Sequence, residues 1–236
     1  MLLVLLFALV AGLVWLSRQC FKANRIDWGS PWINWVDGLI RLLCIHYHRL
    51  QPVDLPLPGE GPAIVVANHI SGLDPFLMIA CSRRPLRFLI AREQYQRFGV
   101  QWLFKAAGCI PVDRERSPEK ALRQAFKALR EGQVVALFPH GKIHLDSDPP
   151  RRTKAGAARL AAISKAPVIP LRISGAARPG HVVESVFVRG RAKVDRLPLI
   201  EAETATSDQL YEAIEHAVSG ELPSGQTLQP RHREDR

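Results

Sequence analysis

A histidine and an aspartate five residues apart carry the clearest chemical signal in this chain. His69 follows Asn68 at the end of the apolar run Ala63–Ala67, and Asp74 lies just before Pro75. The run predicts a buried strand, and proline favours the first turn of a helix. The spacing therefore places an imidazole at a strand end beside a carboxylate at a helix start. Such a pair can serve as a general base with an orienting acid and activate a hydroxyl.

Three clusters downstream of this pair could bind an anion or shape a pocket. Arg114 ends the segment Gly108–Arg114, and a guanidinium suits forked contact with a phosphate. In Phe138–Lys142, Gly141 allows close backbone approach and Lys142 supplies charge. The third cluster, Ala166–Pro170, leads into another apolar run. Singly, a solvated arginine, a strand-end turn and a helix–strand connection explain these clusters better, so their common order is what matters.

Strands and helices alternate along the part of the chain that must position these residues. The expected strands are Ala63–Ala67, Leu86–Ala91, Val134–Phe138, Val168–Ile173 and Val182–Val188. The expected helices are Asp74–Cys81, Tyr95–Ala107, Pro118 to the glycine cap at Gly132, Lys154–Lys165 and Ser207–Ser219. This alternation predicts an α/β sandwich.

The first residues favour attachment to a membrane. Met1–Ser17 has no charged side chain and just reaches the roughly 17 residues needed to span a bilayer. The cations that follow, Arg18, Lys22 and Arg25, favour a cytoplasmic body. A cleaved signal peptide is the competing interpretation, and it would need a basic start and a small-x-small cleavage site. We therefore divide the chain into an anchor and interfacial helix (1–50), a catalytic domain (51–220) and a disordered tail (221–236).

A tryptophan-rich helix follows this first segment. Ser30-Pro31 is typical of a helix start, and Trp32, Trp35 and Leu39 then recur at helical spacing. An amphipathic helix rich in tryptophan can lie in the membrane interface. A core helix of the domain fits the same pattern equally well.

The net charge of +10 over 236 residues points to a polyanionic partner. The basic residues are spread along the chain, and no helix-turn-helix or aromatic RNA-binding motif stands out, so we expect membrane lipids and no nucleic acid. The cysteines show no paired or metal-ligand spacing, and we interpret them as reduced and structural. They are Cys20, Cys44, Cys81 and Cys109.

Taken in order, these motifs resemble the four blocks of the glycerolipid (1-acylglycerol-3-phosphate) acyltransferase family. The first block is Asn-His-x4-Asp, here Asn68 to Asp74, and the second is Gly-x-Ile-x-x-x-Arg, here Gly108 to Arg114. The third is Phe-Pro-Glu-Gly-Thr, here Phe138 to Lys142, and the fourth, apolar-Pro-apolar-apolar-Pro, ends at Pro170. The resemblance covers about Ala63 to Ser174, and the order and spacing make it specific.

The resemblance implies a single α/β acyltransferase-type sandwich domain with a membrane-associated helical segment before it. It implies transfer of a fatty acyl group from acyl-CoA or acyl-carrier protein to a lyso-lipid hydroxyl, with no metal or other cofactor. The location implied is a bacterial inner membrane, with the domain on its cytoplasmic side. The catalytic pair would be His69 and Asp74. The substrate-binding residues would be Asn68, Arg114, His140, Gly141, Lys142 and Pro170.

The third block departs from the family pattern, since His140 stands for a glutamate and Lys142 for a threonine. The acceptor could therefore be 1-acylglycerol-3-phosphate or another lyso-lipid, such as a lyso-ornithine lipid. The same departure is compatible with an inactive family member, and the charge with a non-catalytic, membrane-tethered basic binding protein. An α/β-hydrolase esterase would need Gly-x-Ser-x-Gly after a strand, and the sequence has none.

Overall fold

A largely parallel β-sheet forms the centre of the computed structural model, which describes residues 1–114 and 116–219. In this part of the chain the sheet has six strands in the order β3-β2-β4-β1-β5-β6, of which only β6 runs antiparallel to its neighbour. The bounds are β1 Ala63–Ala67, β2 Leu86–Ala91, β3 Ile110–Val112, β4 Val134–Leu137, β5 Val168–Ser174 and β6 Lys193–Arg196. Strand β1 lies between β4 and β5, with Val65 paired to Ala136 and Ile169.

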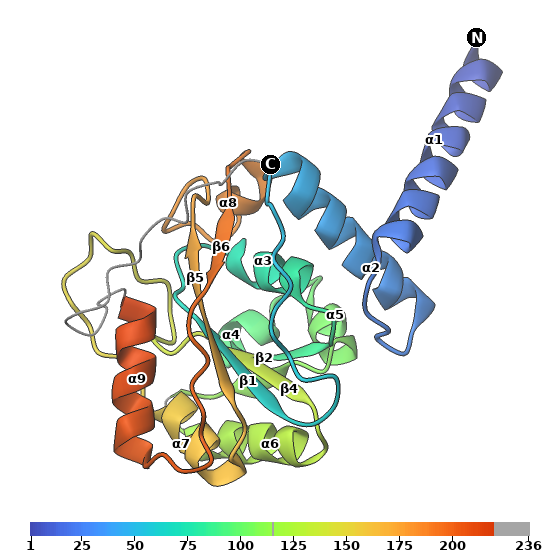
Figure 1. The fold of residues 1–236 in the computed structure, drawn as a ribbon. Coiled ribbons are helices and arrows are strands. Elements are labelled where there is room, and N and C mark those ends of the chain that lie inside the picture. Colours follow the sequence, from blue (N-terminus) through green and yellow to red (C-terminus); the bar gives the residue numbers. More distant parts are fainter. Residues whose placement is uncertain (115, 220–236) are drawn as a thin grey trace, which may run out of the picture.

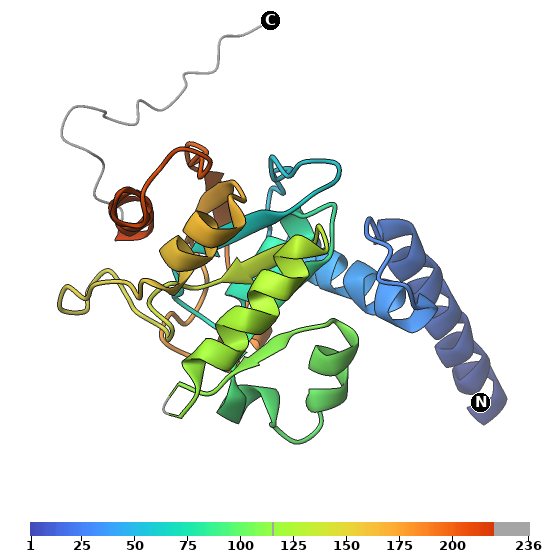
Figure 2. The same ribbon diagram turned by 90° about the horizontal axis from the view of Figure 1, so that it is seen from below.

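Helices cover both faces of this sheet (Figures 1 and 2). On one face lie α6 (Pro118–Arg130), α7 (Gly156–Ser164) and α9 (Ser207–Ser219), and on the other lies α3 (Asp74–Cys81). Alternate residues of β1 enter the two cores, Val65 on the α3 face and Ile64 and Val66 on the other. All five residues of β1 are buried, which explains its unbroken apolar sequence. The predicted α/β sandwich is confirmed.

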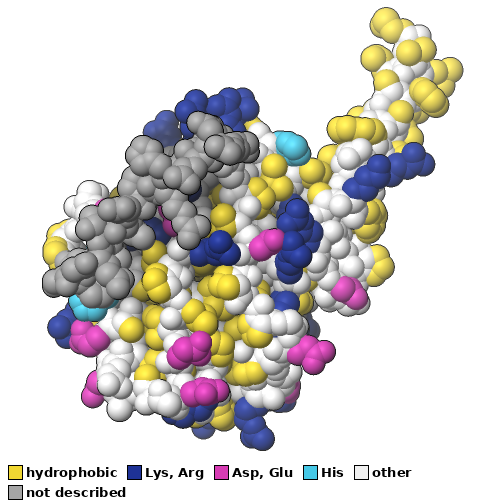
Figure 3. All heavy atoms as spheres, viewed as in Figure 1, with side chains coloured by type: hydrophobic (Ala, Val, Ile, Leu, Met, Phe, Trp, Pro, Cys, Tyr) yellow, Lys and Arg dark blue, Asp and Glu magenta, His cyan; other side chains and the backbone are white. Residues whose placement is uncertain are grey.

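Helix α1 (Leu2–Ala23) projects away from this body, and its apolar side chains are exposed (Figures 1 and 3). Its mean hydropathy reaches 2.0, and it is long enough to cross a membrane. Helix α2 (Pro31–Leu42) packs against α1 and α3 and continues into the π-helical turn η1 (Leu43–Tyr47). Both interpretations of α2 keep some support, because Ile33 is buried while Trp32 on the same helix is 41% exposed.

A buried ion pair fixes α2 to the domain. Arg41 Nε donates to Asp37 Oδ2 at 2.6 Å, and its remaining donors reach the carbonyls of Ala80 and Ser82 at 2.9 and 2.8 Å. Those carbonyls lie at the end of α3 and just after it. Since each buried charge is paired and hydrogen-bonded, the contact orients α2 and the base of α1 relative to the α/β body.

Two predicted elements are wrong. Val182–Val188 is a loop with the short helix α8 (Glu184–Phe187), and β6 takes the expected place beside β5. The valines at 182, 183 and 188 are exposed, so they line no sheet face. The predicted helix Tyr95–Ala107 is divided into α4 (Arg92–Tyr95) and α5 (Gln101–Ala106), because Gly99 between them has φ +85°. The predicted tail, 221–236, lies outside the described residues.

Candidate active site

The carboxylate of Asp74 organises the loop between β1 and α3. Its Oδ2 accepts hydrogen bonds from the backbone N–H groups of Ile70 and Ser71, at 2.7 and 2.8 Å, and lies 2.8 Å from His69 Nδ1. Its Oδ1 accepts the Ser71 hydroxyl at 2.7 Å. Asp74 is fully buried, so the carboxylate is held in one orientation. Because a carboxylate only accepts, His69 Nδ1 must carry the hydrogen and Nε2 the lone pair.

The imidazole of His69 is held flat and left open at Nε2. It stacks on the Phe138 ring with centroids 4.1 Å apart and planes 15° from parallel. The side chain keeps 18% of its surface exposed, and among the described residues its hydrogen bond to Asp74 is made through Nδ1 and leaves Nε2 free. The backbone N–H of His144 donates to the His69 carbonyl at 2.8 Å, which joins the loop after β4 to the loop between β1 and α3. The geometry is that of a general base awaiting a hydroxyl.

Asn68, expected to bind substrate, connects the loop between β1 and α3 to the sheet. Its Nδ2 donates to the Ile173 carbonyl at 2.9 Å and its Oδ1 accepts the Ile173 N–H at 2.7 Å. The pair of bonds extends the ladder between β1 and β5 by one side chain, and Asn68 is buried. Pro170 likewise lies inside the sheet, buried opposite Val66. Both residues lie where they can set the position of His69.

A cluster of cations comes from two loops, the one after β3 and the one between β4 and α7. Positive charge on Arg114, Arg151 and Lys142 lowers the pKa of Lys154, although partial burial is the larger cause. Arg114 also has a loose ion pair with Glu93, at 3.5 Å. Such repulsion is unfavourable in the empty protein and would be relieved by a bound anion. The structure thus brings the predicted Arg114 and Lys142 together with a residue that the motifs did not single out.

Lys154 is that residue. Its backbone N–H donates to the Pro139 carbonyl at 2.9 Å, so it is fixed to the loop that carries Gly141 and Lys142. A side chain at Gly141, which has φ +77°, would meet Lys154 Nζ at 3.2 Å. The sequence signal was its place just before the N-terminus of an alanine-rich helix, but many surface lysines share it. Only the fold shows that it faces Arg114.

His140 belongs to the same loop, and its side chain is buried. Its exposed fraction is 4%, its ring lies 4.7 Å from that of His144, and its Nδ1 lacks a hydrogen-bond partner in the described residues. Burial lowers the pKa of His140, and His144 lowers it further, while Glu215 acts in the opposite direction. The ring is therefore neutral at pH 7. His140 was expected to bind substrate, and here its side chain is buried rather than exposed beside the cation cluster.

Acid is expected to destabilise the fold through His140. In the unfolded chain histidine has a pKa near its ordinary value of about 6.5, which lies above that of the folded His140. Below this pH the unfolded state binds more protons, so the free energy of unfolding falls. We expect the free energy of unfolding, measured with urea, to fall less between about pH 7.5 and 5.5 for His140→Phe than for the parent. Burial also lowers the pKa of His48, so part of the loss should remain. An identical pH dependence of parent and variant would contradict this interpretation.

The cysteines do not offer a competing nucleophile. Burial raises the pKa of Cys44 to about 12 and that of Cys109 to about 11, so neither forms a thiolate at neutral pH. Cys20 and Cys81 are also buried free thiols with raised pKa values. Within residues 1–114 and 116–219, no cluster of histidine, cysteine and carboxylate side chains has the makings of a metal site.

Comparison with known proteins agrees with this geometry. A family model described as Acyltransferase matches residues 44–174, more than half of the chain, and this range includes the His69–Asp74 pair and the cation cluster. The chain belongs to this acyltransferase family, which confirms the resemblance seen in the four motif blocks.

Individual relatives bear acyltransferase names. The 1-acyl-sn-glycerol-3-phosphate acyltransferase of Bacillus subtilis is 25% identical over 139 residues, 58% of this chain and 66% of the relative. The lyso-ornithine lipid O-acyltransferase of Rhodobacter capsulatus is 28% identical over 112 residues, 47% of this chain and 40% of the relative. The matched segment thus spans less than two thirds of either relative.

A solved structure shares the fold. The 1-acyl-sn-glycerophosphate (LPA) acyltransferase PlsC of Thermotoga maritima aligns with a TM-score of 0.62 at 21% identity. The alignment covers 79% of this chain and 78% of the other. The whole α/β body, rather than a motif alone, is therefore common to the two proteins.

Proposed function

We propose that this protein transfers a fatty acyl group from acyl-CoA or acyl-carrier protein to the hydroxyl of 1-acylglycerol-3-phosphate. The observation that supports the proposal most strongly is the His69–Asp74 pair, in which a buried carboxylate orients an imidazole whose Nε2 is unoccupied. The relative from Bacillus subtilis, which bears the name of this activity, supports the choice of reaction.

The proposed step needs only this pair and the acyl donor. His69 Nε2 accepts the proton of the acceptor hydroxyl as its oxygen attacks the thioester carbonyl. The tetrahedral intermediate collapses, forms the new ester and expels the thiolate, which takes the proton back from the imidazolium. Asp74 stabilises the imidazolium meanwhile and preserves the Nδ1–H tautomer. No metal ion or other cofactor enters this scheme.

The cation cluster supports a phosphate-bearing acceptor. A phosphate monoester carries about −1.5 to −2 charges at neutral pH. Arg114, Lys142 and Lys154 together can match that charge, and binding would relieve the repulsion that helps to lower the pKa of Lys154. A lyso-ornithine lipid is the second candidate, favoured by the relative from Rhodobacter capsulatus and by the changed third block. Its ornithine headgroup pairs a carboxylate with an amine, so it matches three cations less well.

The reaction would take place at a membrane surface. Helix α1 is apolar, exposed and long enough to span a bilayer, and Arg18, Lys22 and Arg25 follow its most apolar part. By the distribution of positive charge, the domain would remain on the cytoplasmic side. The lyso-lipid acceptor would then reach the site from the same bilayer that holds α1.

Removing Arg114 tests the acceptor assignment. Arg114→Ala deletes one charge-assisted contact to the acceptor and should lower kcat/KM for 1-acylglycerol-3-phosphate about 10- to 100-fold, mainly through KM. Lys154→Met should act in the same direction. Lys127→Ala on α6, which removes an exposed cation elsewhere, serves as the control and should change little. The assay uses purified full-length protein and compares this acceptor with lyso-ornithine lipid. A parent enzyme that uses only lyso-ornithine lipid would establish the second candidate instead.

A further inference from the structure

An exposed apolar patch lies on the loop that contains α8. We call Val182, Val183, Phe187 and Val188 the α8 lip. Phe187 is 72% exposed, and the three valines are 46%, 49% and 39% exposed. Exposing a group of large apolar side chains to water is unfavourable, and such a group on a protein surface marks a contact site.

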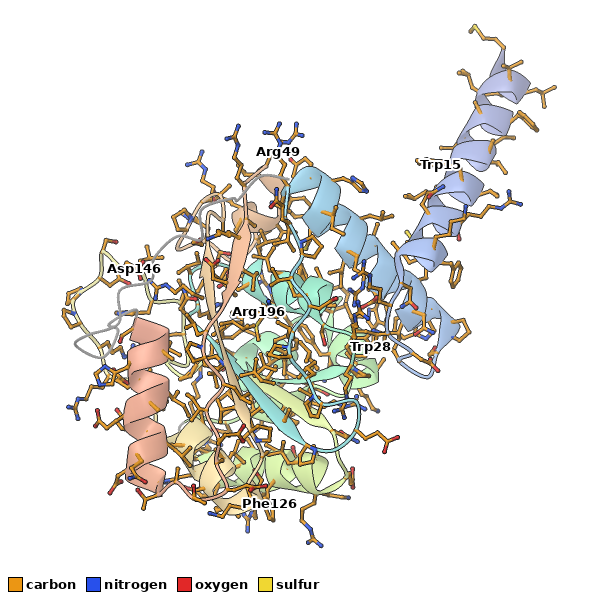
Figure 4. The ribbon with its side chains drawn as sticks, in the orientation of Figure 1. Trp15, Trp28, Arg49, Phe126, Asp146 and Arg196 are labelled. Atoms are coloured by element: carbon orange, nitrogen blue, oxygen red, sulfur yellow. The ribbon has the colours of Figure 1, made fainter. Side chains whose placement is uncertain are left out.

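Arginines surround the α8 lip. Arg178, Arg189 and Arg191 flank it in sequence, and Glu184 is the one acidic residue between them. All three arginines are exposed, and within the described residues none forms an ion pair. Arg49, two residues after η1, is also exposed and forms no ion pair with the residues that the structure describes. In Figure 3 basic side chains gather at this end of the molecule, and Figure 4 places Arg49 there.

Residues beside the α8 lip bond directly to the loop between β1 and α3, which carries His69. The N–H of Gly180 donates to the Ile70 carbonyl at 2.8 Å, and the N–H of Gly72 donates to the His181 carbonyl at 3.1 Å. The two segments are so close that a Cβ at Gly72 would lie 1.9 Å from the Val182 oxygen. Whatever covers the α8 lip is therefore brought next to the His69–Asp74 pair.

Two bonds fix the other side of the α8 lip to η1. The Tyr47 hydroxyl donates to the Phe187 carbonyl at 2.6 Å, and His48 Nε2 lies 3.0 Å from the Val186 carbonyl. Through η1 and α2 the lip is connected to the base of α1. In Figure 4, Arg49 and Trp15 of α1 lie at a similar level, with the apolar end of α1 rising beyond them. A bilayer that contains α1 would thus meet the α8 lip with the same surface.

We propose that the α8 lip is a second membrane contact, which inserts into the headgroup region of an anionic bilayer beside the active site. The proposal rests on the proposed function, because it explains how a lipid acceptor reaches His69. Apolar side chains ringed by arginines match the acyl boundary and the anionic headgroups of such a bilayer. The surplus of unpaired positive charge around the lip favours this occupant over an apolar protein surface.

Photo-crosslinking tests the contact without relying on activity. A benzophenone amino acid replaces Phe187 in one version of the full-length protein and Ile163 in another. Ile163 is the matched control, since it is 66% exposed and lies on α7, which is in the foreground when the molecule is seen from below (Figure 2). After reconstitution in vesicles of phosphatidylcholine with phosphatidylglycerol, mass spectrometry should find lipid adducts at position 187 and not at 163. Adducts at neither position, or only protein adducts at 187, would overturn the proposal.

A charge substitution supplies the second measurement. Phe187→Asp should lower acyl transfer to acceptor presented in phosphatidylglycerol vesicles roughly tenfold more than transfer to acceptor dispersed in detergent, because a carboxylate is repelled by the bilayer. Ile163→Asp should leave that ratio as in the parent, and equal ratios for the two variants would overturn the proposal. If the parent shows no acyl transfer with any acceptor, the proposed function fails, while the adducts at 187 still decide whether the lip contacts lipid.

Discussion

Replacing His69 with alanine is expected to remove acyl transfer almost completely while leaving the protein folded and membrane-bound. Among the described residues, the imidazole is the group beside Asp74 that can take the acceptor proton, and a positioned base contributes about 10²- to 10⁴-fold to the rate. The side chain is partly exposed, and Asp74 keeps its other three hydrogen bonds, so the loop should hold its shape. Initial rates with purified protein at saturating acceptor measure the loss.

The control for this change is His46→Ala. His46 is an exposed histidine on η1, and its loss should alter the rate by no more than about twofold. Circular dichroism and vesicle binding confirm that both variants are folded and attached. Full activity of purified His69→Ala would remove His69 from the mechanism.

The second large effect is expected at Asp74, where two substitutions separate charge from structure. Asp74→Asn keeps an oxygen that can accept from Ile70 and Ser71 but removes the negative charge that stabilises the imidazolium. We expect the rate to fall by about 10²-fold or more, with little loss of stability. Asp74→Ala also leaves two backbone N–H groups and the O–H of Ser71 without an acceptor. At about 1–3 kcal/mol each, this should lower the free energy of unfolding by roughly 3 kcal/mol or more.

The two residues should behave as one unit. Combining His69→Ala with Asp74→Asn is expected to give a rate no lower than that of His69→Ala alone, because Asp74 acts through the imidazole. Rate losses that multiply in the double variant would show that Asp74 has a separate role in the reaction. Chemical unfolding of the same variants supplies the stability values.

The strand that delivers His69 and the helix that begins at Asp74 could be predicted from local pattern. An apolar run buried on both faces identified β1, and Pro75 identified the first turn of α3. The strand predicted around Val182 and Val183 was wrong for a related reason. Exposed valines in a loop have the same local pattern as valines in a strand. The loop and the strand are distinguished only by the pairing of β6 with the edge of β5, which is a tertiary contact.

The candidate site was only partly predictable for the same reason. His69 and Asp74 are close in sequence, so their spacing alone predicts the contact. The cation cluster joins Arg114, Lys142 and Lys154 from loops that meet only in the folded sheet, and Lys154 had no distinguishing local signal. The roles of Asn68 and His140 depend on burial, which the motif could not show.

Product analysis with a defined acceptor tests the proposed chemistry most directly. Purified full-length protein and its His69→Ala variant are incubated in vesicles with 1-acylglycerol-3-phosphate and either acyl-CoA or acyl-carrier protein, and the lipids are identified by mass spectrometry. We expect diacylglycerol phosphate from the parent with at least one donor, and a loss of about 10²-fold or more in the variant. No diacyl product from the parent with either donor, or equal product from the parent and His69→Ala, would contradict the proposed function.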